Sequence, residues 1–315
     1  MSYMLLAGES TAAGIKRVIR EELESAAAQL GQEDVENRDE AIHEARKSIK
    51  KSRAALRLVE EELGETFDHE NRRLRDVGRK LASFRDAAAA IEIFDSVVAG
   101  MEDHPGKAAL SSIRRVLNQH KQRSEQGTRL VGVLGRLVTL LGAMNKRVEE
   151  WPLEADGFPV IAKGLERTFR RGRTAMATAH EEASPLDYHD WRKRVKDHWY
   201  QLILLENLWT HKMRGQVKTL KELETCLGDD HDLVLLLEKL NSTRAEYDPK
   251  DLESFETAAG HHQKELRQRA AVLGREIYHE RPADFVQRVG KRWNTWQKRP
   301  LTSSERKHSH SSMAR

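Results

Sequence analysis

The sequence predicts an all-α fold built from two similar, antiparallel helical bundles. Charged residues make up 33% of the chain and aromatic residues 6%, with few glycines and prolines, which is typical of helical proteins. Apolar residues recur every three or four positions, as at Leu74, Val77 and Leu81, and no run alternates as a strand between hairpin turns would. A basic pattern led by histidine also occurs twice, which indicates an internal duplication.

The two copies of this pattern lie 146 residues apart. They read His43-x-x-Arg46-Lys47-x-x-Lys50 and His189-x-x-Arg192-Lys193-x-x-Lys196. The same offset relates Arg72 to Lys218, Arg75 to Lys221, Leu81 to Leu227 and Asp86 to Asp232. Because one register persists through two separate motifs, we expect two copies of one module.

Glycine and proline divide the helical pattern into segments. We expect helices at 8–30, 36–63, 67–102 with a break near 84, 106–126 and 127–150, then at 160–181, 185–210, 213–240, 249–279 and 283–297. Ser184-Pro185 and Asp248-Pro249 each place a capping residue before a proline of the first turn. The segment 151–159 contains two prolines and a glycine, so the predicted modules span 8–150 and 157–298, followed by a disordered basic tail at 299–315.

Bulk composition limits the classes of function. The net charge is +4, from 54 basic and 50 acidic residues, so a polyanion could bind only if the cations were gathered on one surface. The single cysteine, Cys226, excludes internal disulfides and cysteine-based zinc sites, and its leucine neighbours predict a buried thiol. No stretch approaches about 18 apolar residues and no signal peptide is recognisable, so we expect a cytoplasmic protein without a membrane span.

The first histidine-led segment predicts a helix with a basic band beside an apolar face. On a helical wheel the basic side chains fall within roughly 120° of one another, and the adjoining arc is apolar. The basic set is Arg46, Lys47, Lys50, Arg53 and Arg57, and the apolar set is Ile42, Ala45, Ile49, Leu56 and Val59. In the second copy Trp191, Val195, Leu202 and Leu205 take the apolar arc.

Two further rows of cations accompany the band. Arg72, Arg75 and Arg79 lie on one stripe of the next predicted helix, and Lys218 and Lys221 repeat the first two, with Thr225 in the third place. Before the histidine, Arg17 and Arg20 align at an offset of 150 with Arg167 and Arg170, beside Arg171.

A basic stripe on a single helix is usually just a solvated face. Here residues 43–57 hold six lysines and arginines against one acidic residue, Glu44, and cations at this spacing repel one another. Because the arrangement occurs twice, we favour an anionic ligand. For His43 and His189 a structural role and ligand contact stay open, whereas the surrounding cations disfavour a metal site.

The motifs resemble the CHAD family, the conserved-histidine α-helical domain, over about residues 8–298. The resemblance rests on HEARKSIKKSRAALRLV with LASFRDAAAAIEIF, and on HDWRKRVKDHWYQLILL with LGDDHDLVLLL. It implies two bundles related by a pseudo-two-fold axis, a basic surface or central channel that binds inorganic polyphosphate, and no catalysis or cofactor. The family's motifs fall on His43, Arg46, Lys50, Lys51, Arg53 and Arg57, and on His189, Arg192, Lys196 and Tyr200. Asp197 and Trp199 stand where the second motif usually has arginines, which predicts a weaker second copy.

The expected function is therefore non-catalytic binding of polyphosphate, and of other polyanions, by the paired basic rows, in the cytoplasm and, by resemblance, at polyphosphate granules. The candidate binding residues are Arg17, Arg20, His43, Arg46, Lys47, Lys50, Arg53, Arg57, Arg72, Arg75, Arg79, Arg167, Arg170, Arg171, His189, Arg192, Lys193, Lys196, Lys218 and Lys221. A phosphoryl-transfer enzyme is disfavoured because no phosphate-binding loop is present and the dense acidic group Asp229, Asp230 and Asp232 does not by itself indicate a magnesium site. The main alternative is an RNA-binding or scaffold protein that uses the same stripes.

Overall fold

The computed structural model describes residues 3–32, 38–82, 86–101, 106–124 and 130–298. Within these ranges the protein is all-α, with twelve α-helices, two short 3-10 turns and no strand, as the sequence predicts. The helices are α1 (Thr11–Leu30), α2 (Arg38–Leu58), α3 (Glu60–Leu63), α4 (Glu65–Ala82), α5 (Asp86–Gly100), α6 (Lys107–Ser124), α7 (Leu130–Val148), α8 (Pro159–Glu182), α9 (Pro185–Leu204), α10 (His211–Ser242), α11 (Pro249–Ile277) and α12 (Pro282–Gln297). The predicted tail at 299–315 lies outside the described residues.

Local sequence signals account for several helix ends. The Ser184 hydroxyl accepts a hydrogen bond from the Asp187 backbone amide. The Asp248 carboxylate accepts hydrogen bonds from the backbone amides of Lys250 and Asp251. Both predicted caps are thus confirmed. Val59, with φ −109° and ψ 20°, ends α2, so the predicted helix 36–63 is in fact divided into α2 and α3.

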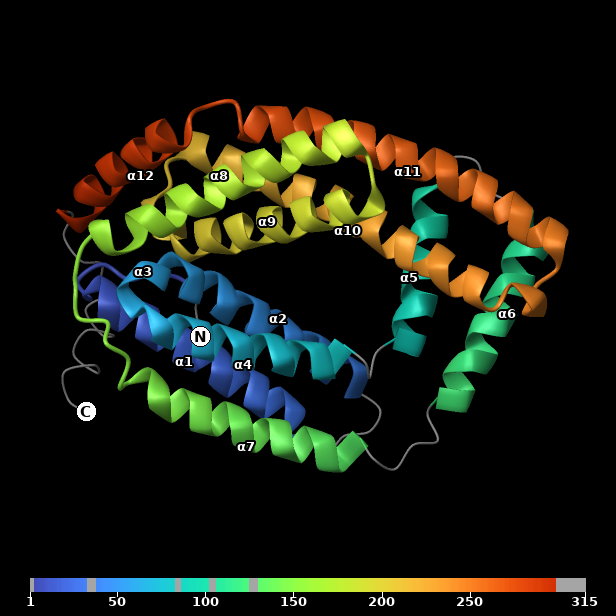
Figure 1. Ribbon diagram of the computed structural model, residues 1–315, viewed down its shortest axis with the longest axis horizontal. Coiled ribbons are helices and arrows are strands. Elements are labelled where there is room, and N and C mark those ends of the chain that lie inside the picture. The colour runs from blue at the N-terminus through green and yellow to red at the C-terminus, as the bar shows by residue number, and fades with distance from the viewer. Residues whose placement is uncertain (1–2, 33–37, 83–85, 102–105, 125–129, 299–315) are drawn as a thin grey trace.

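Four helices of the first half, α1, α2, α4 and α7, pack against one another, and α8, α9, α12 and the first part of α10 form a second group (Figure 1). The predicted apolar faces are buried in this packing: Ile42, Ile49 and Leu56 on α2, and Trp191 and Val195 on α9, are each at most 1% exposed. The burial confirms the helical wheels drawn from the sequence.

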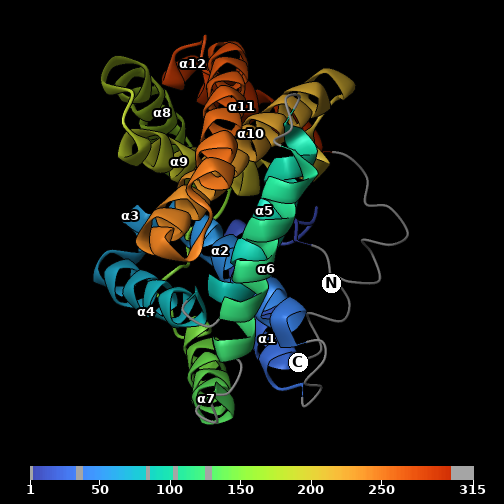
Figure 2. The same ribbon diagram turned by 90° about the vertical axis from the view of Figure 1, so that its right-hand side faces the viewer.

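Helices α5 and α6 lie apart from the other first-half helices. They pack on the second part of α10 and the first part of α11 (Figures 1 and 2). Phe94 of α5 stacks on Phe255 of α11 with ring centroids 5.4 Å apart, within a cluster that also contains Ile113 and Leu236. Residues of both predicted modules therefore share one hydrophobic core.

The two groups meet where α2 lies beside α8 and α9. Helices α2 and α9 run in the same direction (Figure 1), and the Gln201 side chain of α9 donates a hydrogen bond of 3.1 Å to the Ala54 carbonyl of α2. At Gly164 of α8 the backbone comes so close to Leu58 that a Cβ would lie 2.1 Å from the Leu58 oxygen. This contact brings the two histidine-led helices side by side.

The connection between the halves, residues 149–158, is not helical, but it is not a loose linker. Trp151 and Leu153 are 5% and 2% exposed, and the Asp156 carboxylate accepts the Thr11 amide at 2.6 Å. Among the described helices, none has both the length and the apolar character that crossing a membrane requires.

Candidate polyanion-binding site

Four cations from the two histidine-led helices converge where α2 meets α9. We call Arg46, Lys50, Arg192 and Lys196 the cation cluster. Burial, followed by the charges of Lys196, Arg46 and Arg192, lowers the pKa of the Lys50 amine to about 7, although Glu224 acts in the opposite direction. The four side chains are therefore close enough to repel one another in a poorly solvated place.

Several donors of this region lack acceptors. Lys50 forms no hydrogen bond or ion pair with any residue that the structure describes, in contrast to Lys196. The Arg192 Nε and the His189 Nδ1 atoms are buried and likewise have no hydrogen-bond partner in the described ranges. Because a buried donor without an acceptor costs about 1–3 kcal/mol, these atoms indicate a place for an external acceptor.

The histidine of the second motif lies against a second histidine. The His189 and His231 rings are tilted by 32°, with their centroids 4.1 Å apart, and His231 belongs to α10. Burial, and then the nearby Arg192, His189 and Lys193, lower the pKa of His231 to about 3. Burial, and then Lys193 and Arg192, lower the pKa of His189, with Asp190 opposing. Both rings are therefore neutral at physiological pH, and each can still donate one N–H. His43, in the first motif, is exposed.

A buried carboxylate of α10 neutralises part of the site. Glu224 is 4% exposed, and its two oxygens lie 2.7 Å from the amines of Lys196 and Lys221. Burial opposes its ionisation, but Lys196 and Lys221 outweigh this and lower the pKa of Glu224 to about 2. Lys221 also lies 4.3 Å from the centre of the Trp199 ring.

A second set of cations, the arginine band, joins α2 and α4 and comprises Arg53, Arg57, Arg75 and Arg79. Burial and then Arg57, Arg75 and Arg79 lower the pKa of Arg53 to about 10, with Asp197 opposing. Arg57 forms an ion pair of 3.1 Å with Asp197 of α9. Asp197, which stands where the second motif usually has an arginine, thus forms an ion pair with Arg57 of the first motif.

The band continues onto α8 through Arg171. Burial and the nearby Arg167, Arg194 and Arg57 lower the pKa of Arg171, while Glu60 raises it. Arg167 itself pairs with Glu60 and Glu61. Arg170, Arg171 and Arg194 line a pocket between α8 and α9 together with Thr174, Ala175, Thr178, Asp187 and Asp190.

Arg194 is absent from the sequence-predicted residues. Its counterpart at an offset of 146 is Ser48, which is buried, so comparison of the copies carried no signal. The place of Arg194 beside Arg170 and Arg171 follows only from the packing of α8 on α9.

The remaining predicted residues lie elsewhere. Arg17 is held by Glu9 and Glu21, and Arg20 pairs with Glu149, all among the first-half helices and their flanking segments. Four others are exposed: Arg72 and Lys218 on α4 and α10, Lys47 beside Glu44, and Lys193 beside Asp190. The structure therefore does not bring Arg17 and Arg20 to the cluster or the band.

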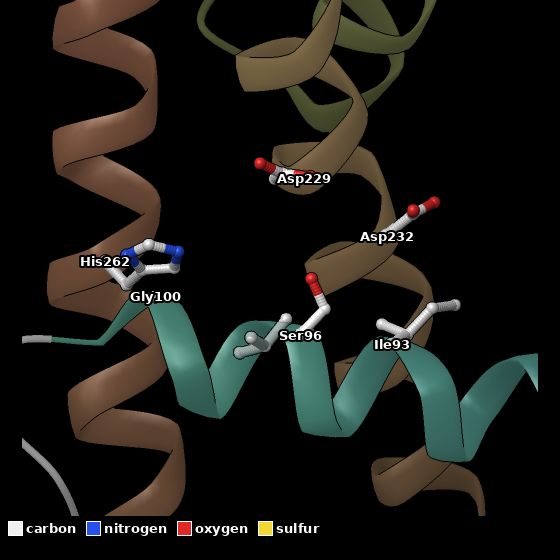
Figure 3. A pocket seen from close by; sticks show the side chains of 7 residues that line it. Ile93, Ser96, Gly100, Asp229, Asp232 and His262 are labelled. Atoms are coloured by element: carbon white, nitrogen blue, oxygen red, sulfur yellow. The ribbon is translucent and has the colours of Figure 1, made fainter.

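A small pocket lies between α5, α10 and α11 on the α10 side of the cluster (Figure 3). It is lined by Ile93, Ser96, Val97, Gly100, Asp229, Asp232 and His262. Burial raises the pKa of Asp232 despite Arg192, Lys196 and Lys50 nearby. In the part of the chain that the structure describes, no group of three or more His, Cys, Asp or Glu side chains is arranged to hold a metal ion.

Comparison with known proteins identifies the family of this chain. The model of the CHAD domain family matches residues 17–241. The crystal structure of the CHAD domain from the plant Ricinus communis is similar, with a TM-score of 0.58 and 19% identity over 89% of this chain and 94% of that chain. No curated protein matches the chain. Because the family model covers well over half of the residues, including both histidine-led helices, the chain belongs to the CHAD family.

Proposed function

We propose that the chain binds inorganic polyphosphate without chemically changing it, through the cation cluster and the arginine band. The observation that carries this proposal is the cluster itself. The two histidine-led helices bring four cations together, and Lys50 and the Arg192 Nε atom have no acceptor among the described residues. Family membership supports the proposal but does not identify the ligand.

Polyphosphate suits this surface for chemical reasons. It is a linear polymer with about one negative charge per phosphate, and charge-assisted hydrogen bonds from Arg and Lys to its nonbridging oxygens are short and strong. An anion placed among Lys50, Lys196, Arg46 and Arg192 would relieve their repulsion. No base-reading group is required.

We further propose that the two halves are copies of one module, spanning 8–150 and 157–298 and related by a pseudo-two-fold axis between α2 and α9. The pairs of neighbouring helices support this: α1 packs on α2 and α7, and α2 on α4, just as α8 packs on α9 and α12, and α9 on α10. The axis would place Arg46 opposite Arg192 and Lys50 opposite Lys196.

RNA is the main competing ligand for the same cations. Proteins that bind single strands usually stack bases on exposed aromatic rings. Near the described cations the half-exposed ring is Trp199, and the Lys221 amine lies over its face. The arrangement therefore favours a polyanion without bases.

The test is a titration of the purified protein with polyphosphates of several lengths at two salt concentrations, with structured RNA as competitor. We expect affinity to fall steeply with salt, because each neutralised phosphate releases about 0.7 counterion from a single-stranded polyanion. Binding that RNA abolishes at equal charge would contradict the proposal. Phosphate release in the presence of Mg²⁺ or Mn²⁺ would contradict the non-catalytic part.

We also propose a cytoplasmic location at polyphosphate granules, which co-localisation of the tagged protein with stained granules would test.

A further inference from the structure

The two lysines of the cation cluster differ in their ion pairing. Lys50 and Lys196 occupy the same position of the repeated motif. Lys196 forms an ion pair of 2.7 Å with Glu224, whereas Lys50 has no ion-pair partner within the described ranges. We call the position of Lys50 the open half-site, and that of Lys196 and Lys221 the occupied half-site.

Glu224 lies where a bound anion would lie. Its carboxylate uses both oxygens, one for Lys196 and one for Lys221, at 2.7 Å each. The Glu224 side chain is 5% exposed and that of Lys196 is 19% exposed, so water screens this ion pair little, whereas the Lys221 side chain is 48% exposed. An external phosphate can take the place between the two amines only after it displaces this carboxylate.

Among the residues that the structure describes, no carboxylate pairs with Lys50 as Glu224 pairs with Lys196. The offset of 146 that relates Lys50 to Lys196 and Arg75 to Lys221 relates Gly78 to Glu224. A Cβ at Gly78 would lie 3.8 Å from the Ile49 side chain, an ordinary contact, so the backbone there accepts a side chain. At this position of the repeat the two halves therefore differ by one carboxylate.

We propose that Glu224 makes binding depend on chain length, because its carboxylate fills the half-site at Lys196 and Lys221 until a chain anchored at Lys50 displaces it. This inference rests on the proposed binding of polyphosphate. A short phosphate such as pyrophosphate binds at the open half-site alone. A longer chain held there presents its next phosphates at high effective concentration, and can therefore compete with the tethered carboxylate.

The experiment compares pyrophosphate and long-chain polyphosphate on the full chain and on Glu224→Gln, near pH 7 and at constant salt. Glutamine keeps the shape but removes the charge, so the long chain should bind about tenfold more tightly, while pyrophosphate changes by about twofold or less. Glu222→Gln is the matched control: Glu222 lies on the same helix, is exposed and pairs with Arg269, so both affinities should stay unchanged.

The reciprocal variant is Gly78→Glu, which puts a glutamate at the repeat position that corresponds to Glu224, on the helix that carries Arg75. It should weaken the binding of both ligands by about fivefold or more. Thermal unfolding of each variant shows that the fold is intact, and Gly78→Glu decides the question if Glu224→Gln does not fold. The inference is overturned if Glu224→Gln leaves the long-chain affinity unchanged or strengthens both ligands equally, or if Gly78→Glu weakens neither. A wild-type chain that does not bind polyphosphate would instead refute the proposed function.

Discussion

At the scale of single residues, the Lys50 amine lies in surroundings unlike those of an ordinary surface lysine. Burial and three neighbouring cations lower its pKa to about 7. In the unfolded chain a lysine holds its proton to a much higher pH. The fold thus keeps an amine whose proton is weakly held, and an arriving anion would stabilise the charged form.

We therefore expect polyphosphate binding at pH 8 to take up close to one proton. Without ligand most Lys50 amines are neutral at pH 8, and in the complex they are charged, so affinity should fall by up to about tenfold per pH unit above pH 7. Below pH 7 both states are protonated and the dependence should vanish. Calorimetry in buffers of different ionisation enthalpy measures the uptake.

The variant Lys50→Arg serves as the control for this prediction, because arginine stays charged at every relevant pH. It should bind without the extra proton. If it took up as many protons as the wild type, another group would be responsible. The pKa values of His189 and His231, both lowered, make these rings the alternative sources to check.

The site residues that could be predicted from sequence are those that the repeat duplicates. Arg46, Lys50, Arg192 and Lys196 follow from the paired motifs, and the structure brings them together. Glu224 could not be found in this way, because its counterpart is Gly78. A comparison of copies identifies shared chemistry and is blind to a residue that makes the copies differ.

At the scale of helices, the apolar periodicity predicted which face of each helix is buried, since a 3.6-residue period dictates it. The partner of each face did not follow from the period. Helices α5 and α6 have apolar faces like the others, yet they pack on α10 and α11. That choice depends on the path of the chain after α4, about which local sequence carries little information.

The contact between α2 and α8 depends on Gly164. A Cβ there would lie 2.1 Å from the Leu58 oxygen, a backbone atom that cannot move alone. We expect Gly164→Ala to lower the free energy of unfolding by about 3 kcal/mol or more, because the two helices must separate. Chemical denaturation measures it.

The matched control is Gly260→Ala in α11, an exposed helical position where a Cβ would meet nothing within 4 Å. Alanine there should raise the free energy of unfolding by up to about 1 kcal/mol, since it restricts the unfolded chain. Equal effects of the two substitutions would show that the close helix contact is not needed.

At the scale of the whole molecule, the halves are joined both by the α2–α9 contact and by the core shared between α5, α6, α10 and α11. Phe255 is fully buried and stacks on Phe94. We expect Phe255→Ala to cost about 3–5 kcal/mol in the free energy of unfolding, and to leave polyphosphate affinity at low temperature within about twofold. Thermal denaturation and a binding titration on the same sample check both. A broad transition in which only the second half melts would contradict the shared core.

The central claim is that polyphosphate binds at the cation cluster rather than by net charge alone. The most direct test compares Lys50→Ala with Lys196→Ala, made together, against Lys250→Ala with Lys291→Ala. Both double variants lose the same formal charge, and Lys250 and Lys291 are exposed on α11 and α12. We predict that the cluster variant loses about 30-fold or more in affinity for long-chain polyphosphate at moderate salt, and the control less than about threefold. Equal losses in the two variants would contradict the account.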